Sequence, residues 1–188
     1  MGRWEPDSRG RLEQAALALY GERGFENTTV AEIAARAGVT ERTFFRYFAD
    51  KREVLFSGAS SLEELLVTAV VSAPDSAAPI DAVVAAFEAA GTLLQQRREF
   101  ARQRQAIIAA NTGLRERELI KLASLASAIA DALRRRGVEA PAASLTAEAG
   151  VAIFTVAFER WVDESNQQDL AELIRESLDH LRAVTAGR

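Results

Sequence analysis

Residues 37 to 51, AGVTERTFFRYFADK, gather side chains that can recognise another molecule. The stretch holds three phenylalanines, one tyrosine, two arginines and one lysine directly after a glycine. A guanidinium can donate two parallel hydrogen bonds to a base edge or a phosphate, and an aromatic ring can contact a thymine methyl group. The segment is therefore the first candidate for a binding surface.

The elements that must hold this segment are helices. Apolar residues recur at helical spacing along almost the whole chain, and strand alternation is almost absent, which predicts an all-α protein. A capping box, Thr29 with Glu32, begins one short helix, and Thr40 begins the next at Glu41 to Tyr47. The linking RAGVT contains Gly38, which suits a tight turn. Two such helices match the helix-turn-helix pattern.

The second of these helices has two different faces. Phe44 and Phe48 lie four residues apart and are expected to face a small core with Val39 and Ile33. The opposite face carries two arginines and an aromatic ring, which a DNA major groove would cover; the alternative is that Phe45 and Arg46 contact protein instead. Hydroxyl and ammonium groups at the rim suit phosphate oxygens. The predicted DNA contacts are Thr29, Thr40, Glu41, Arg42, Thr43, Phe45, Arg46, Tyr47 and Lys51.

Net charge alone does not indicate a nucleic-acid partner. The chain has 188 residues and a formal charge of -4. Residues 1–52 sum to +1 and the remainder to -5, so a near-neutral segment precedes an acidic one. This small difference in charge is compatible with DNA binding by the first segment but does not by itself indicate it.

Composition argues against several classes of site. The chain has no cysteine and one histidine, His180, which disfavours a metal centre. No phosphate-binding loop or paired acidic motif is recognisable, so no catalytic residue and no cofactor are expected. The apolar stretch Ala149 to Phe158 is shorter than the roughly 20 residues that a membrane span needs. We therefore expect a cytoplasmic protein with no membrane partner.

The run ERGFENTTVAEIAARAGVTERTFFRYFADKREVL resembles the N-terminal DNA-binding domain of the tetracycline-repressor (TetR) family of bacterial regulators, over about residues 9 to 56. The Thr-Val, Ile-Ala, Ala-Gly-Val, Thr-Phe-Phe and Tyr-Phe-x-x-Lys elements occur in order at the family's spacing. Glu41 departs from the neutral polar residue common in the family. Its carboxylate could accept from cytosine N4 or repel phosphate.

The resemblance implies a fold and a mechanism. A three-helix DNA-binding domain, residues 1–52, would precede a helical ligand-binding and dimerisation domain, residues 53–188. A homodimer would place two recognition helices on a near-palindromic double-stranded operator, with half-sites roughly 34 to 36 Å apart. A small apolar effector would shift the helix from about Lys51 to Val71 and release the repressor from DNA.

The C-terminal part is predicted to form the dimer interface and the effector pocket. A helix from about Ser144 to Val162 is apolar nearly all round, and one from Asp169 to Ala183 carries a stripe of Leu170, Leu173, Ile174, Leu178 and Leu181. The two are expected to pair with their symmetry copies, unless they only close a monomeric core. Candidate pocket residues are Phe87, Leu94, Phe100, Gln103, Ile107, Leu125, Ile129, Phe154 and Phe158.

Other interpretations remain open from sequence. A helical-bundle enzyme or small-molecule carrier would need no DNA, and a regulator controlled by a protein partner would need no pocket. A group of arginines, Arg97, Arg98, Arg102 and Arg104, could bind an anionic ligand such as an acyl thioester or could face water.

Overall fold

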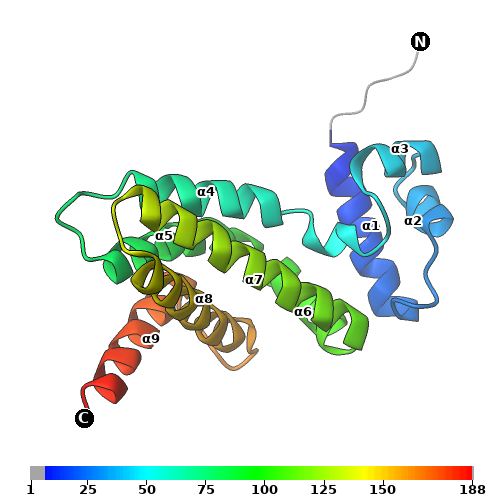
Figure 1. Ribbon diagram of the computed structural model, residues 1–188. Coiled ribbons are helices and arrows are strands. Elements are labelled where there is room, and N and C mark those ends of the chain that lie inside the picture. The colour runs from blue at the N-terminus through cyan, green and yellow to red at the C-terminus, as the bar shows by residue number, and fades with distance from the viewer. Residues whose placement is uncertain (1–6, 188) are drawn as a thin grey trace. The chain divides into compact units, whose positions relative to one another are not determined.

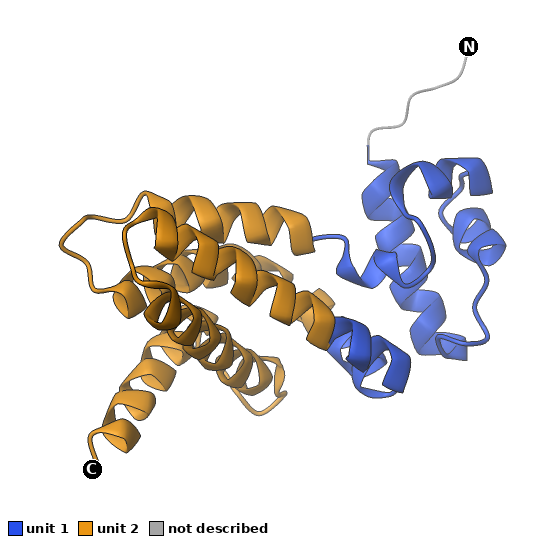
Figure 2. Cartoon of the chain, in the orientation of Figure 1, with its two compact units in different colours: residues 1–58, 103–118 blue, residues 59–102, 119–188 orange. Residues whose placement is uncertain are grey.

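The computed structural model describes residues 7–187, and these residues form helices and loops without a strand. Figure 1 shows the order of the helices along the chain. The chain separates into two compact units, coloured in Figure 2. Unit 1 comprises residues 1–58 and 103–118, and unit 2 comprises residues 59–102 and 119–188. The first unit therefore extends past the expected boundary at residue 52 and includes a later segment.

Unit 1 begins with a three-helix arrangement around a small core. Its helices are α1 (Ser8–Arg23), α2 (Val30–Arg36) and α3 (Glu41–Tyr47), followed by the short 3-10 helix η1 (Glu53–Phe56). Helix α1 packs against α2 and η1, and α2 packs against α3. The side chains that fill the core are fully or nearly fully buried: Leu12, Ala16, Leu19, Tyr20, Ile33, Ala34, Phe44, Phe48, Val54 and Leu55.

The later segment, residues 103–118, joins unit 1 through charged side chains. It contains the second part of α6 (Arg98–Ala109) and the first part of α7 (Thr112–Arg135). Arg104 donates from Nε to the carbonyl of Leu55 at 2.6 Å and from Nη1 to Glu118 at 2.9 Å. Arg117 donates from Nε to Glu53 at 2.6 Å. The segment is thus bonded to η1, which ends the N-terminal part of the unit.

Unit 2 is a helical bundle. Its remaining helices are α4 (Ala59–Val71), α5 (Pro79–Leu94), the 3-10 helix η2 (Gln95–Arg97), α8 (Ala140–Val162) and α9 (Leu170–Thr185). Helix α5 packs against α4, α8 and α9, and α8 packs against α9. Gly150 permits the close approach of α8 to α5, because a Cβ atom at this position would lie 2.4 Å from Cγ1 of Val83.

The C-terminal end of α8 is closed by polar contacts within unit 2. Arg98 donates from Nε to the carbonyl of Trp161 at 3.0 Å, and Arg102 donates from Nε to the carbonyl of Val162 at 3.0 Å. The indole Nε1 of the buried Trp161 donates to Oε1 of Gln95 at 2.9 Å. Arg98 and Arg102 thus donate to carbonyls that a helix end leaves without intrahelical partners. These two arginines are engaged by the protein itself, and do not simply face water or an anionic ligand.

One expected helix differs from the structure. The helix expected from Lys51 to Val71 is interrupted, with η1 ending at Phe56 and α4 beginning at Ala59. Farther along the chain, η2 separates α5 from α6.

The apolar stripe on α9 is used within the chain. Leu170, Leu173 and Ile174 are fully buried in the core of unit 2, where α9 packs against α5 and α8. Leu181 and Val184 on the same helix are exposed. Most of the stripe therefore closes the chain's own core, and only its C-terminal end is available to a second copy.

Two stretches, Glu53–Val71 and Ala140–Val162, are long and apolar enough to cross a membrane when judged by length and composition alone. The second is α8, which buries Ala143, Ala147 and Ala157 in the core of unit 2. Core helices of soluble proteins meet the same criteria, and 39% of the apolar window in α8 is buried within the bundle.

Candidate nucleic-acid interface

The turn between α2 and α3 has the geometry expected of a helix-turn-helix. Gly38 has φ of 69°, in the left-handed region where glycine has no Cβ penalty. The amide of Val39 donates to the carbonyl of Ala34 at 2.9 Å and closes the turn. Thr40 then caps α3, because its hydroxyl accepts from the amide of Thr43 at 3.2 Å.

The inner face of α3 holds the helix in unit 1. Phe44 is fully buried and Phe48 nearly so, with their ring centroids 5.4 Å apart. Phe44 also meets Phe45 edge to face at 5.4 Å. The predicted inward orientation of Phe44 and Phe48 is confirmed. Because the two rings are packed from the inside, they fix which residues of α3 face outward.

The outer face of α3 is exposed within unit 1. The Phe45 side chain is 55% exposed and Tyr47 is 40% exposed. Glu41, Arg42 and Arg46 are exposed as well. Together, this half-exposed phenyl ring and the two exposed arginines give unit 1 a surface that is both apolar and cationic. This arrangement could enter the major groove of DNA.

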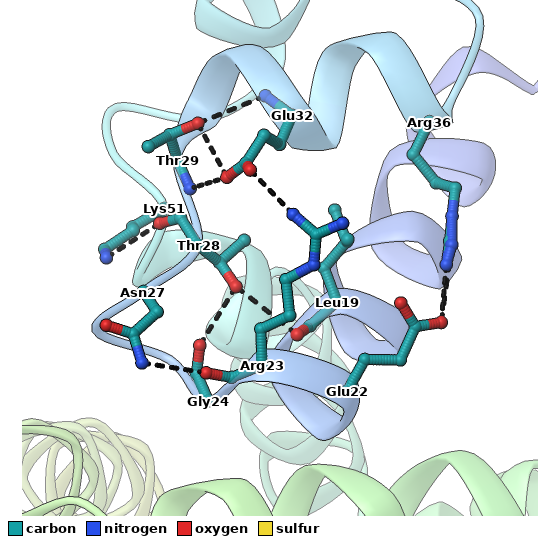
Figure 3. Close-up of polar contacts among 10 residues, drawn as sticks. All are labelled: Leu19, Glu22, Arg23, Gly24, Asn27, Thr28, Thr29, Glu32, Arg36 and Lys51. Atoms are coloured by element: carbon teal, nitrogen blue, oxygen red, sulfur yellow. Dashed lines mark hydrogen bonds and ion pairs between the residues drawn. The ribbon is translucent and has the colours of Figure 1, made fainter.

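Thr29 and Thr43 are both engaged in local capping contacts. The Thr29 hydroxyl and amide are bonded to Glu32, which confirms the capping box (Figure 3). The backbone hydrogen bond from Thr29 is the largest of several contacts that lower the pKa of the Glu32 carboxyl, and the Thr29 hydroxyl and Arg23 add to it. Thr43 shares a hydroxyl contact of 3.1 Å with Thr40. Thr29 and Thr40 are exposed and Thr43 is half-buried.

Lys51 has partners other than the predicted phosphate. Its ammonium donates to the carbonyl oxygens of Phe25, Glu26 and Thr28 at 2.8, 3.2 and 2.9 Å. A lysine has three N–H donors, so in this arrangement none is left over for a phosphate.

The predicted effector residues are divided between the two units. In unit 2, Phe87, Leu125, Ile129 and Phe154 are core residues, while Leu94 and Phe158 are half-buried against that core. The rings of Phe87 and Phe154 stack with centroids 4.9 Å apart. Phe100 is half-buried beneath the guanidinium of Arg97. Gln103 is exposed and Ile107 half-buried, and both belong to unit 1.

An open groove in unit 2 has a volume of about 640 Å³. It is lined by residues of α4 and α7, and none of them is among the predicted effector residues: Glu63, Val67, Ala128, Asp131, Arg134 and Arg135. Among the residues that the structure describes, no group of three or more His, Cys, Asp or Glu side chains could hold a metal ion.

Sequence reasoning missed the contribution of residues 103–118 to the unit that carries α3. Asn111 donates to Glu26 at 2.8 Å, in addition to the contacts of Arg104 and Arg117. A local sequence pattern carries no signal for contacts between residues 85 positions apart.

Comparison with known families agrees with this geometry. Residues 13–57 match the family model described as bacterial regulatory proteins, tetR family. Residues 77–186 match the model described as the MftR C-terminal domain. The chain belongs to the TetR family of transcriptional regulators. The all-helical fold predicted from sequence, with a helix-turn-helix domain before a second helical domain, is confirmed.

Individual TetR relatives match over less than half of the chain. The regulator TcmR of Streptomyces glaucescens is 39% identical over 82 residues, which cover 44% of this chain and 36% of TcmR. The repressor KstR2 of Mycobacterium tuberculosis is 40% identical over 47 residues, 25% of this chain and 24% of KstR2. The chain thus spans about a quarter to a third of the length of these relatives. They are transcriptional regulators and not enzymes.

Solved TetR-type structures match almost the whole chain in fold. SmeT in complex with triclosan has a TM-score of 0.67 and 23% identity, and covers 94% of this chain and 90% of its own. Thermus thermophilus FadR in complex with lauroyl-CoA has a TM-score of 0.56 and 24% identity, with 93% of each chain covered. At these identities the likeness concerns the fold.

Proposed function

We propose that this TetR-family regulator is a homodimeric repressor that binds a near-palindromic DNA operator and leaves it when a small apolar molecule binds its C-terminal domain. The observation that supports this most directly is the exposed outer face of α3, where the side chains of Arg42, Phe45 and Arg46 are all exposed.

The side chains of this face suit different parts of DNA. Arg42 and Arg46 can each donate two hydrogen bonds to O6 and N7 of guanine, and Phe45 can contact a thymine methyl group. Glu41 can accept from the N4 amino group of cytosine. Hydroxyl groups at the rim of this surface would contact phosphates: those of Thr29, Thr40, Thr43 and Tyr47. Such contacts fix the position of the protein on the duplex without reading its sequence.

The homodimer is supported by apolar residues that remain exposed on α8 and α9. Leu145 is 74% exposed and Val156 is 53% exposed, and Ala152 lies exposed between them on the same helix. Leu181 and Val184 are exposed on α9. These residues recur at helical spacing on two helices that pack against each other, and together they form an apolar surface. In a two-fold dimer, this surface would pack against the same surface of the second copy.

An apolar effector is supported by the aromatic cluster in unit 2. Phe154 stacks on Phe87 and contacts Phe158, whose ring in turn lies 5.5 Å from that of Trp161. The solved structures of SmeT and FadR contain triclosan and lauroyl-CoA, each with an apolar body. The predicted pocket residues line the effector site in this hypothesis, and the protein acts in the cytoplasm without a cofactor.

Selection of random DNA duplexes by the purified protein, followed by sequencing, tests the proposed function. We expect an enriched inverted repeat whose half-sites are roughly 34 to 36 Å apart. A screen of apolar metabolites by thermal shift would then identify compounds that both stabilise the protein and release the selected duplex. The absence of any enriched sequence would reject the DNA-binding proposal, and enrichment without a releasing compound would reject the effector.

A further inference from the structure

One glutamate of α1 is buried among apolar residues. Glu13 is only 8% exposed, and its neighbours on the helix, Leu12, Ala16 and Leu17, are buried as well. A carboxylate that is taken out of water is costly unless polar or charged groups bond to it. DNA binding by the exposed face of α3 makes no use of this carboxylate. Its partners within unit 1 therefore indicate its role.

The carboxylate of Glu13 holds Ser57. The Ser57 hydroxyl donates to Oε1 of Glu13 at 2.8 Å, across 44 positions of the chain. Ser57 directly follows η1 and stands two residues before α4 begins at Ala59. The N-terminal stretch of unit 1 ends at the next residue, Gly58, where the colour changes in Figure 2. The bond therefore ties the end of this stretch to its first helix.

Arg9 extends the same network to the end of α3. Its Nε donates to Oε1 of Glu13 at 3.3 Å, and its Nη2 donates to the carbonyl of Ser57. The central carbon of its guanidinium lies 6.0 Å from the ring centroid of Phe48, at the limit of a cation–π interaction. Phe48 is the C-cap of α3. Arg9 thus contacts α1, the end of α3 and the chain after η1.

Glu13 is the central member of this network. Its Oε1 is the acceptor that Ser57 and Arg9 share. The Arg9 side chain is 49% exposed, whereas that of Glu13 is 10% exposed. An exposed ion pair contributes little by itself, but a hydroxyl that donates to an ionised carboxylate makes one of the stronger hydrogen bonds. The bond to Ser57 is therefore the one that should matter most.

We propose that Glu13 is a positioning residue of the DNA-binding unit. Its carboxylate fixes Ser57 and Arg9 on α1, and so holds the chain that follows α3 and η1 in the arrangement in which α3 binds DNA. Only the effect on DNA binding rests on the proposed function. The anchoring of Ser57 is tested without DNA.

Three substitutions separate anchoring from stability and from charge. Glu13→Leu removes the acceptor, and because apolar replacements of buried ionic groups are often neutral or stabilising, its urea midpoint should be no lower than that of the wild type. Glu13→Gln keeps an oxygen that can accept from the Ser57 hydroxyl. Glu22→Leu is the matched control, since it removes the same charge from an exposed residue of α1.

The test without DNA is hydrogen–deuterium exchange of residues 53–58, expressed as protection relative to the unfolded chain. We expect several-fold faster exchange in Glu13→Leu and in Ser57→Ala, and wild-type exchange in Glu13→Gln and Glu22→Leu. The double variant Glu13→Leu/Ser57→Ala should exchange no faster than either single variant, because both remove the same bond. Wild-type protection in the two single variants, or additive effects in the double variant, would overturn the proposal.

The test with DNA titrates a duplex that the wild-type protein has selected from a random pool. We expect Glu13→Leu to bind it roughly two- to ten-fold more weakly, the range that one hydrogen bond contributes. Glu13→Gln should bind like the wild type, and Glu22→Leu at least as tightly. Equal losses in Glu13→Gln and Glu13→Leu, or a loss in Glu13→Leu that follows a lower urea midpoint, would overturn the positioning role. If the wild-type chain binds no duplex, the proposed function fails, and the exchange result still decides whether Glu13 anchors Ser57.

Discussion

The guanidinium of Arg46 lies over the ring of Tyr47, with its central carbon 4.8 Å from the ring centroid. Its Nη2 also donates to the Tyr47 hydroxyl at 2.9 Å. Both side chains are on the exposed surface of α3, and the stacking restrains the long arginine before DNA arrives. A restrained side chain loses less conformational entropy on binding.

Arg46→Ala should relax base preference at one position of each half-site. We expect a loss of about 1 to 3 kcal/mol of discrimination at that base pair, because a bidentate contact to guanine disappears. Selection of random duplexes by the variant measures the change. Arg115→Ala is the matched control, since Arg115 is also exposed in unit 1 but lies on α7. An unchanged preference in Arg46→Ala would contradict the assigned role.

Phe44→Ala and Phe45→Ala should affect different properties of the protein. The first should mainly lower stability, and the second should mainly weaken DNA binding. Phe44 is fully buried, so its truncation should lower the free energy of unfolding by about 3 to 5 kcal/mol through a cavity. Phe45 is 55% exposed and meets Phe44 edge to face, so its truncation should lower the free energy of unfolding by only about 0.5 to 1.5 kcal/mol while it weakens DNA binding. Urea denaturation and a binding titration measure the two effects. A loss of stability in Phe45→Ala as large as that in Phe44→Ala, with DNA binding unchanged, would contradict the assigned role of Phe45.

Gly150→Ala should destabilise unit 2. The added methyl group would meet Cγ1 of Val83, and we expect a cost of about 1 to 3 kcal/mol as α5 and α8 move apart. Gly21→Ala is the matched control, since α1 offers open space there. That control should be neutral or slightly stabilising, because alanine is the better helix former. Thermal unfolding of both variants checks the prediction, and equal shifts would contradict it.

Val156→Glu should convert the protein to monomers. A carboxylate on the exposed apolar surface of α8 would face its own copy across the two-fold axis, where like charges repel. Leu93→Glu, at another exposed apolar residue in unit 2, should leave the oligomeric state unchanged. Light scattering after gel filtration gives the masses. A dimer that survives Val156→Glu would place the interface elsewhere.

Glu32→Gln should reduce stability at neutral pH but not in acid. Hydrogen bonds from Thr29 are the main cause of the lowered pKa of Glu32. A carboxyl whose pKa is lower in the folded state stabilises the fold above its unfolded pKa, and this contribution is lost as pH falls through the lower folded value. The difference from wild type should therefore shrink below the usual value of 4.5. Urea unfolding from pH 7 to pH 3 measures it, with Glu41→Gln as control.

Local features of the fold could be predicted because their signals lie within a few residues. Thr29 and Glu32 form the capping box, Thr40 caps α3 and Gly38 takes a left-handed conformation. The division of α3 into an inner and an outer face follows from the four-residue spacing of Phe44 and Phe48. Each of these features depends on helical geometry alone.

Features that depend on distant contacts could not be predicted. A lysine near the end of α3 fits a phosphate contact by type and position, yet Lys51 meets carbonyls more than twenty positions earlier in the chain. The α9 stripe suits a partner helix in the same chain as well as one in a second copy, and periodicity does not distinguish the two. The interruption between η1 and α4 also left no clear signal, apart from Gly58.

The bonds from Arg104 and Arg117 to Leu55 and Glu53 have a consequence for protein engineering. A chimera that joins residues 1–58 to the effector domain of another regulator would contain an incomplete unit 1, because residues 103–118 also belong to that unit. Exchanging both stretches together should preserve operator recognition better than a single junction after the first sixty residues.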